Sequence, residues 1–436
     1  MLPSMIAGII FSCYKAASPE WHPRMNFGFY IILAAQFLSA LADNSLLFAA
    51  IALLAEHHAP SWHTPVLQEG FVISYILLAP FVGAFADSLP KGRVMFISNN
   101  IKLLGCLVML SGVNPLLAYA IVGLGAAAYS PAKYGILTEY LPPRQLVAAN
   151  SWMEGLTVLA IVLGAIIGGL LVSPTVAQPI LDWMGAPLLG GRIDGPAELA
   201  ILLITGLYVA AAACNLYIPR LAIDHRPLGN NPGFLLRDFY HCFRLLWKDP
   251  LGQVSLAVTT LFWGTGATLR LIVLAWAGVA LHYDIGQAAR LTAWVAIGIA
   301  IGSILAARFV KLENSIKVLP VGIAMGLIVL IMNPITDPLL ATGLLVVIGA
   351  MGGYFVVPMN ALLQHRGHLL MGAGSSIAVQ NFNENLSILL MLSLYAGMDK
   401  MGFSIYDIIW VFGLLLSLAM TTLYRRHRHD QDLGQI

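Results

Sequence analysis

Long apolar runs dominate this sequence and constrain its fold more than any other feature. A helix needs about 20 mostly apolar residues to cross the hydrocarbon core of a bilayer, and such runs follow one another from residue 27 to residue 424. Only 10% of the 436 residues are charged, whereas a soluble domain carries roughly 25%. So few charges cannot cover a water-facing surface. The sequence therefore predicts an all-α polytopic membrane protein, not a soluble enzyme.

Breaks at proline, glycine and charged residues divide the apolar sequence into twelve predicted transmembrane helices. Their expected ranges are 27–55, 66–88, 93–112, 115–138, 146–172, 196–219, 251–281, 286–309, 315–333, 338–363, 372–398 and 403–424. An apolar stretch before them, within residues 1–26, is too short to span and follows no basic cluster. We interpret it as an N-terminal extension, neither a cleaved signal nor a membrane span.

The two halves of the sequence repeat each other. The segment 220–250 is the one long polar connection in the middle, and six predicted spans lie on each side of it. The pattern A-x-[NQ]-x-[WF]-x-E-x-L-[ST] occurs in the fifth span, with Glu154, and again 230 residues later in the eleventh, with Glu384. This repeat predicts two pseudo-symmetric six-helix bundles in parallel orientation, an arrangement that resembles the major facilitator fold. The predicted units are an extension (1–26), an N-terminal bundle (27–219), a cytoplasmic linker (220–250), a C-terminal bundle (251–424) and a basic cytoplasmic tail (425–436).

The basic residues predict the orientation of the chain, because cytoplasmic loops hold an excess of lysine and arginine. Most of the 23 lysines and arginines fall on one side if both termini are cytoplasmic. Only Arg192, Arg290 and Lys400 then fall in loops on the other side. We therefore expect both termini to be cytoplasmic.

Composition and motifs exclude several other functions. A net charge of +2 does not indicate a nucleic-acid partner. The sequence has no phosphate-binding G-x-x-x-x-G-K-[ST] loop, no H-E-x-x-H motif and no nucleophile elbow. The four cysteines lie far apart without metal-binding spacing. Three histidines, His57, His58 and His63, cluster in a predicted outer loop, where solvated side chains are the expected outcome although a metal site is conceivable. We expect a monomer without catalytic residues, cofactor or metal.

The loop after the second predicted span carries a gating signature. It reads Gly83-Ala-Phe-Ala-Asp87-Ser-Leu-Pro-Lys91-Gly-Arg93, which resembles the G-x-x-x-D and basic-Gly-Arg loop of major facilitators. A carboxylate at the C-terminus of a helix is disfavoured by the helix dipole. Asp87 therefore needs a partner, either Arg93 or the N-terminus of another helix, and the resemblance implies the start of the eleventh span. The alternative is a solvated turn whose basic residues only set the topology.

Six charged residues fall well inside predicted spans, away from the span ends, and three of them are acidic and three basic. An unpaired charge at the centre of a lipid-facing helix costs roughly 2.5–3.5 kcal/mol on insertion scales, so these side chains should pair or line a cavity. Lys102 lies too deep to reach water easily and should pair with an acidic neighbour. The six are Asp43, Lys102, Lys133, Glu154, Arg270 and Glu384.

Asp43 is the first candidate for substrate contact. It shares a polar helical face with Gln36 and adjoins Asn44, and Arg270 lies at nearly the same depth in the seventh span. Because the first and seventh helices of major facilitators face each other across a central cavity, we predict that Asp43 and Arg270 form a cross-half ion pair or a divided headgroup site. A structural salt bridge is the alternative.

The remaining candidates lie on the fourth, fifth and eleventh spans. Lys133 and Tyr129 share a face of the fourth span, where Lys133 could extend its ammonium toward the interface. Glu154 has Asn150, and Glu384 has Gln380, four residues earlier on the same face. Since this pair recurs in both halves, an architectural role is favoured over substrate contact for it.

Several longer stretches resemble bacterial lysophospholipid transporters of the major facilitator superfamily. They read QFLSALADNSLLF at 36–48, AAAYSPAKYGIL at 126–137, LFWG at 261–264, GGYFVVPMNALLQ at 352–364 and AVQNFNE at 378–384. The resemblance implies inward flipping of lysophosphatidylethanolamine and lysophosphatidylglycerol across the bacterial inner membrane. It also implies a functional partner, the acyltransferase/acyl-carrier-protein synthetase that re-acylates these lipids.

A lysophospholipid headgroup fits the predicted charges. Arg270 and Lys133 could contact its phosphate, and Asp43, Glu154 or Glu384 could contact an ethanolamine ammonium. Three alternatives stay open at this point: a major facilitator exporter of another amphipathic small molecule, a membrane-embedded acyltransferase, for which the sequence shows no catalytic pair, and a scaffold that does not transport.

Overall fold

The computed structural model describes residues 27–60, 63–184, 195–219, 231–283 and 285–432, with Leu221, Arg226 and Gly229 between them. The expected extension at 1–26 lies outside the described residues. So do four basic residues that the orientation argument uses, namely Lys15, Arg24, Arg192 and Arg220.

The described residues form fourteen α-helices, and twelve of them coincide with the twelve predicted spans. In the first half these are α2 (Phe27–Glu56), α3 (His63–Ser88), α4 (Lys91–Leu110), α5 (Pro115–Tyr140), α6 (Leu146–Leu171) and α9 (Pro196–Leu216). In the second half they are α11 (Pro250–Ala280), α12 (Ile285–Phe309), α13 (Leu319–Leu330), α14 (Pro338–Met371), α15 (Ala373–Lys400) and α16 (Ile405–Asp432). Eleven of the spans in the described ranges are apolar enough to cross a membrane by composition alone. The exception is α15, because glutamine, asparagine, glutamate and serine side chains interrupt it.

Local sequence signals place several helix starts. Proline occupies the first position of α5, α11 and α14, where its missing N–H costs no helical hydrogen bond. A polar side chain precedes each of these prolines and accepts a hydrogen bond from the first turn: Asn114 from Leu116 N at 2.9 Å, Asp249 from Gly252 N at 2.7 Å, and Asp337 from Leu339 N at 2.9 Å. These caps fix the boundaries that the apolar pattern leaves uncertain.

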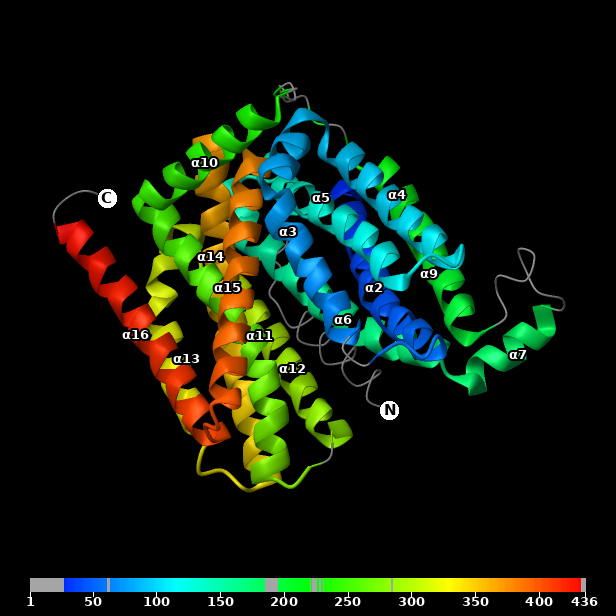
Figure 1. Ribbon diagram of the computed structural model, residues 1–436. Coiled ribbons are helices and arrows are strands. Elements are labelled where there is room, and N and C mark those ends of the chain that lie inside the picture. Colours follow the sequence, from blue (N-terminus) through cyan, green and yellow to red (C-terminus); the bar gives the residue numbers. More distant parts are fainter. Residues whose placement is uncertain are drawn as a thin grey trace.

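The two halves pack together along two equivalent seams (Figure 1). In one seam α3 of the first half packs against α15 of the second, and in the other α6 packs against α12 and α14. Because α3 corresponds to α12 and α6 to α15 in the sequence repeat, the seams are related by the pseudo-symmetry of the chain. Helix α2 packs on α6 and α9 of its own half, and α11 packs on α14, α15 and α16.

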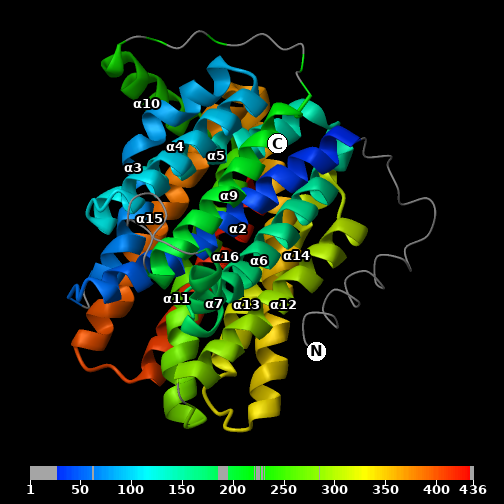
Figure 2. The same ribbon diagram turned by 90° about the vertical axis from the view of Figure 1, so that its right-hand side faces the viewer.

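The linker and the tail contain helix that the sequence analysis did not predict. Within 220–250, α10 (Pro232–Lys248) lies across one end of the bundle (Figures 1 and 2) and packs on α3, α11, α14 and α15. We call this end of the molecule the α10 end. Its buried Leu235, Cys242 and Leu246 face the bundle. The expected tail is the continuation of α16, which stays helical to Asp432. A further short helix, α7 (Pro174–Met184), precedes α9.

The outer surface of the bundle is apolar, whereas polar side chains are gathered inside it. Many large hydrophobic residues are exposed on the spans, which is stable only where the solvent is lipid. Examples with at least half of their surface exposed are Leu77, Leu104, Leu117, Leu170, Leu390 and Leu418. Buried polar residues include Lys102, Asn150, Glu154 and Gln364.

The closest helix pair, α12 and α14, depends on glycines that let the two backbones touch. A Cβ atom on Gly353 of α14 would overlap the carbonyl oxygen of Ile299, and one on Gly302 of α12 would overlap that of Ala350. Small residues at such contacts are the usual means of close packing between membrane helices. Gly343, on the same α14, has no atom within 4 Å of such a Cβ.

We expect Gly353→Val to destabilise the protein by about 1–3 kcal/mol, because the side chain must push α12 away from α14. Gly343→Val is the matched control and should leave the unfolding temperature of the purified protein in detergent nearly unchanged. Equal unfolding temperatures for the two variants would contradict the described packing.

Candidate functional site

The first site feature is the contact of Asp87 with the start of α15. The carboxylate of Asp87 accepts hydrogen bonds from the backbone N–H of Gly374 at 2.7 Å and of Ser375 at 2.8 Å, and from the Ser375 hydroxyl at 2.9 Å. The N-terminus of a helix presents free N–H groups and a partial positive charge, so it favours an anion. This contact joins the two halves at the α10 end, and of the two partners predicted for Asp87 it is the helix N-terminus that the structure supplies.

Other gating residues support Asp87 from its own half. Lys91 donates to Asp87 at 2.8 Å and to the carbonyl of Ala86 at 2.7 Å, and it also pairs with Glu139 at 3.2 Å. Gly83 permits the close approach, since a Cβ there would lie 2.9 Å from the Cα of Ser375. Arg93 is exposed and is not among the partners that the described residues give Asp87.

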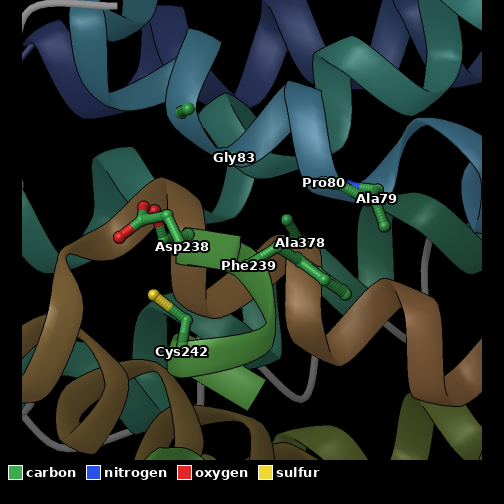
Figure 3. Close-up of a pocket in the computed structure, with 9 residues that line it drawn as sticks. Ala79, Pro80, Gly83, Asp238, Phe239, Cys242 and Ala378 are labelled. Atoms are coloured by element: carbon green, nitrogen blue, oxygen red, sulfur yellow. The ribbon is translucent and has the colours of Figure 1, made fainter. Parts of the chain in front are cut away.

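Helix α10 covers this contact from outside the bundle. Phe239 packs in an apolar cluster with Val82 of α3 and Ala378 of α15, and its ring meets that of Phe382 edge-on, with centroids 5.5 Å apart. Figure 3 shows Asp238, Phe239 and Cys242 of α10 beside a small pocket whose other walls are α3 and α15. The linker between the halves, through its helix α10, therefore lies directly on the seam between α3 and α15, where Asp87 binds.

Asp43 and Arg270 are not brought together, and the predicted cross-half pair is wrong for this conformation. Asp43 pairs instead with Lys102 of its own half at 2.7 Å and accepts a hydrogen bond from the Tyr208 hydroxyl at 2.6 Å. Arg270 is exposed on α11. The prediction that Lys102 pairs with an acidic neighbour is confirmed. The physical reason for both results is proximity, because α9 packs against both α2 and α4 within one half.

The side chains around this ion pair complete a buried network. Lys102 also donates to the Ser39 hydroxyl at 3.0 Å, and its ammonium lies 4.7 Å from the ring centroid of Tyr129. Tyr129 therefore contacts Lys102 rather than sharing a site with Lys133. Gln36 donates to the carbonyl of Met153 at 3.3 Å, and Asn44 donates to the carbonyl of Ala40 at 2.8 Å. Asn44 thus bonds a carbonyl of its own helix instead of extending toward the other half.

Lys133 points into the protein, not toward the interface. Its ammonium donates to the hydroxyl of Thr157 on α6 at 3.3 Å and lies 4.7 Å from the ring centroid of Tyr134. The expectation that this side chain could reach the interface is therefore not met here. Its charge remains inside the first half, half-buried beside the α6 face that carries Glu154.

The repeated Asn/Gln–Glu pairs meet across the second seam. Glu154 accepts from Asn360 of α14 at 3.3 Å and from Tyr134 at 3.4 Å. Gln380 donates to Glu384 at 2.7 Å and to Asn360 at 3.0 Å. Asn360 and Gln380 together therefore connect Glu154 of the first half to Glu384 of the second. Figure 1 shows α6, α14 and α15, which carry these residues, in the middle of the bundle.

A second amide pair crosses the same seam. Asn150 and Gln364 exchange two hydrogen bonds of 2.9 and 2.8 Å, and the hydroxyl of Ser151 donates to the carbonyl of Ser303 at 2.8 Å. Helical spacing alone predicts that Asn150 pairs with Glu154, but the side-chain amide of Asn150 binds Gln364 of the other half.

Several residues of the site were missed by sequence reasoning. Asn360 and Gln364 stand four residues apart on α14, the same spacing that singled out the pair on α15, so this signal was available. Tyr208 carried no such signal, because a lone hydroxyl in an apolar span is ordinary and only packing shows what it contacts. Thr157 ends the repeated pattern in the fifth span, but the pattern does not show its contact with Lys133.

Comparison with known proteins decides the family. The model of the Major Facilitator Superfamily matches residues 32–391. A curated relative from Serratia proteamaculans (strain 568), named lysophospholipid transporter LplT, is 44% identical over 411 residues, which cover 94% of this chain and 98% of the relative. The protein of the same name from Yersinia pestis (strain Pestoides F) is 45% identical over 381 residues, which cover 87% of this chain and 89% of the relative. This chain belongs to the lysophospholipid transporter family of the major facilitator superfamily.

Solved structures share the major facilitator fold with this family member at low sequence identity. The fucose transporter FucP, titled as an outward conformation, has a TM-score of 0.71 at 13% identity and covers 92% of this chain and 98% of its own. A bacterial homologue of ferroportin, titled as outward-facing, has a TM-score of 0.68 at 16% identity and covers 93% and 100%. At these identities the likeness supports the all-α fold alone.

For a lysophospholipid transporter, the contacts above divide into two kinds. Asp87 and the pairs Asn150–Gln364 and Glu154–Asn360 join the two halves, so these contacts break if the halves separate. Asp43, Lys102 and Lys133 have their partners within one half, so they keep their positions if the halves move as rigid bodies.

Replacing Lys102 by methionine should destabilise the transporter by about 3–5 kcal/mol, because it leaves the Asp43 carboxylate in apolar surroundings without its cation. Adding Asp43→Asn should recover part of the loss. Lys400→Met, at the exposed end of α15, is the control. The measurement is the unfolding temperature in detergent, and wild-type stability of the Lys102 variant would show that the ion pair does not hold this core.

Proposed function

We propose that this protein flips lysophospholipids, chiefly lysophosphatidylethanolamine and lysophosphatidylglycerol, to the cytoplasmic leaflet of the bacterial inner membrane. The observation that carries the proposal is the 44% identity to a protein named lysophospholipid transporter over nearly the whole of both chains. The flipped lipid would be re-acylated by an acyltransferase/acyl-carrier-protein synthetase, which makes that enzyme the functional partner. The chain itself acts as a monomeric transporter without catalytic residues, cofactor or metal.

The proposed orientation places the α10 end in the cytoplasm, with both termini. Arg237, Arg244 and Lys248 lie on α10 and Arg425 and Arg426 near the end of α16, and Figure 1 shows both elements at the same end of the molecule. An excess of basic residues is typical of cytoplasmic loops. The Asp87 contact then closes the cytoplasmic side in this conformation, and transport proceeds by rocking one half against the other.

Charged side chains of both halves are proposed to bind the headgroup. Lys133 and Arg270 carry positive charge suited to the phosphate that all these lipids share. Asp43 already has Lys102 as a partner, so an ethanolamine ammonium would contact Asp43 and Asn44 only by competing with that lysine. The wider proposed site includes Gln36, Tyr129, Glu154, Gln380 and Glu384.

Arg270→Ala and Asp43→Asn should each lower uptake of labelled lysophosphatidylethanolamine by at least about tenfold, the effect of losing roughly 1.4 kcal/mol of interaction. Uptake is measured in spheroplasts that lack their own transporter, with the amount of inserted protein determined for each variant. The controls are Arg290→Ala and Asp399→Asn, which remove exposed charges of the same types outside the proposed site.

The outcomes separate the competing functions. Absence of uptake by the wild-type chain would overturn the lipid-flipping proposal, and competition by unrelated amphipathic solutes would favour an exporter. Normal uptake by both site variants would show that the headgroup binds elsewhere. Uptake that survives loss of all the buried charges would point to a scaffold.

A further inference from the structure

The glutamates repeated in the two halves form one buried cluster that contains no cation of its own. Glu154 and Glu384 are 4% and 8% exposed, and the amides that connect them, Asn360 and Gln380, are 2% and 6% exposed. Among the described residues, neither glutamate takes part in a salt bridge. The ammonium of Lys133 lies within electrostatic range of Glu154, but its hydrogen bond goes to the hydroxyl of Thr157.

The groups that interact electrostatically with Glu384 are neutral or negative. Tyr75 of α3 and Tyr134 of α5 lie within electrostatic range of it, and Glu154 of α6 adds a second acid. From α11 and α14 the polar neighbours are Thr259 and Asn360. Two ionised carboxylates at such a place would repel each other and lose their hydration, and no cation is paired with Glu384 among the described residues.

The hydrogen bonds of the cluster are one donor short. The amide nitrogen of Gln380 is divided between Glu384 at 2.7 Å and Asn360 at 3.0 Å. The amide oxygen of Gln380 is buried and accepts no hydrogen bond from the described residues. A buried acceptor without a donor costs roughly 1–3 kcal/mol. A carboxylic acid supplies a donor where a carboxylate supplies none.

We propose that this cluster is a proton-binding site and that Glu384 holds the proton while the α10 end is closed. A proton removes one of the two like charges and adds the missing donor, so one change corrects both deficits. A metal cation fits less well, because the amide donor of Gln380 already points at the Glu384 carboxylate.

The site is connected to the gate through the seam that it bridges. The Asn360–Glu154 contact and the Asn150–Gln364 pair both join α6 to α14, and opening the α10 end separates these helices. Water then reaches Glu384 and stabilises its ionised form. Protonation therefore favours the closed conformation and deprotonation the open one. If lipid flipping is the function proposed above, each inward step would release this proton to the cytoplasm.

The test measures gate opening without lipid, so that it stands apart from the transport assay. Spin labels are placed at Arg144→Cys, which precedes α6, and Lys311→Cys, which follows α12, both exposed at the α10 end, in a variant whose own cysteines are replaced by alanine. Pulsed electron–electron distances are recorded in lipid nanodiscs at pH values from about 5.5 to 8.5.

For the wild-type cluster, the distance distribution should shift from short at low pH to long at high pH. Glu384→Gln keeps the hydrogen bonds of the protonated acid. In this variant the spin-label distance should stay short at every pH, so that the pH-dependent shift is lost completely. Glu313→Gln, an exposed glutamate of the same half, is the matched control and should follow the wild type.

Three results would overturn the proposal. The first is a spin-label distance that still changes with pH in Glu384→Gln, and the second is a distance that does not change with pH in the wild type. The third is a change of distance when sodium replaces choline in the buffer at constant pH. None of these depends on lipid transport. A lost uptake signal with an intact pH response would instead refute the flipping function and leave the proton site standing.

Discussion

One carboxylate, Asp87, joins the two halves of this protein at the α10 end. It lies at the end of α3, where the helix dipole disfavours it, and its hydrogen bonds come from the start of α15 in the other half. The contact needs Gly83 for close approach, Lys91 for charge balance and the start of α15 at Gly372, whose φ of 103° suits a glycine. Because these requirements come from both halves, the closed conformation depends on their register, and α10 covers the same seam.

The polar interior follows from the cost of charge in an apolar medium. Asp43 and Lys102 neutralise each other inside the first half, and Tyr208 and Ser39 satisfy their remaining hydrogen bonds. Glu154 and Glu384 lie instead where the halves meet and have amide partners in place of cations. Contacts within a half survive rigid-body rocking, whereas those between halves must break. This difference separates a fixed framework from a cluster that responds to the conformational change.

The helices could be predicted from the sequence because lipid requires long apolar runs, and the repeat around Glu154 and Glu384 correctly indicated two equivalent halves. Electrostatics also predicted that Asp87 and Lys102 need partners, and the resemblance to major facilitators implied the start of α15 as the partner of Asp87. The partner of Asp43 could not be predicted in this way. Its depth in the membrane suggested Arg270 as the partner. The choice between Arg270 and Lys102 depends on which helices pack against α2, and the hydrophobic periodicity of a sequence does not show helix packing. Helix α10 was not predicted, because a basic amphipathic helix has the same composition as a polar linker.

The central claim is that lipid crosses only when the contact between α3, α5 and α15 opens. A Cβ on Gly135 of α5 would lie 3.2 Å from the Cβ of Ala373 at the start of α15, close to the spacing of about 3.5–4.5 Å in disulfides. The direct measurement is flipping of fluorescent lysophosphatidylethanolamine in proteoliposomes by Gly135→Cys/Ala373→Cys in a background without other cysteines. Oxidation should abolish flipping, and a reductant should restore it. Undiminished flipping by the oxidised, cross-linked protein would contradict the account.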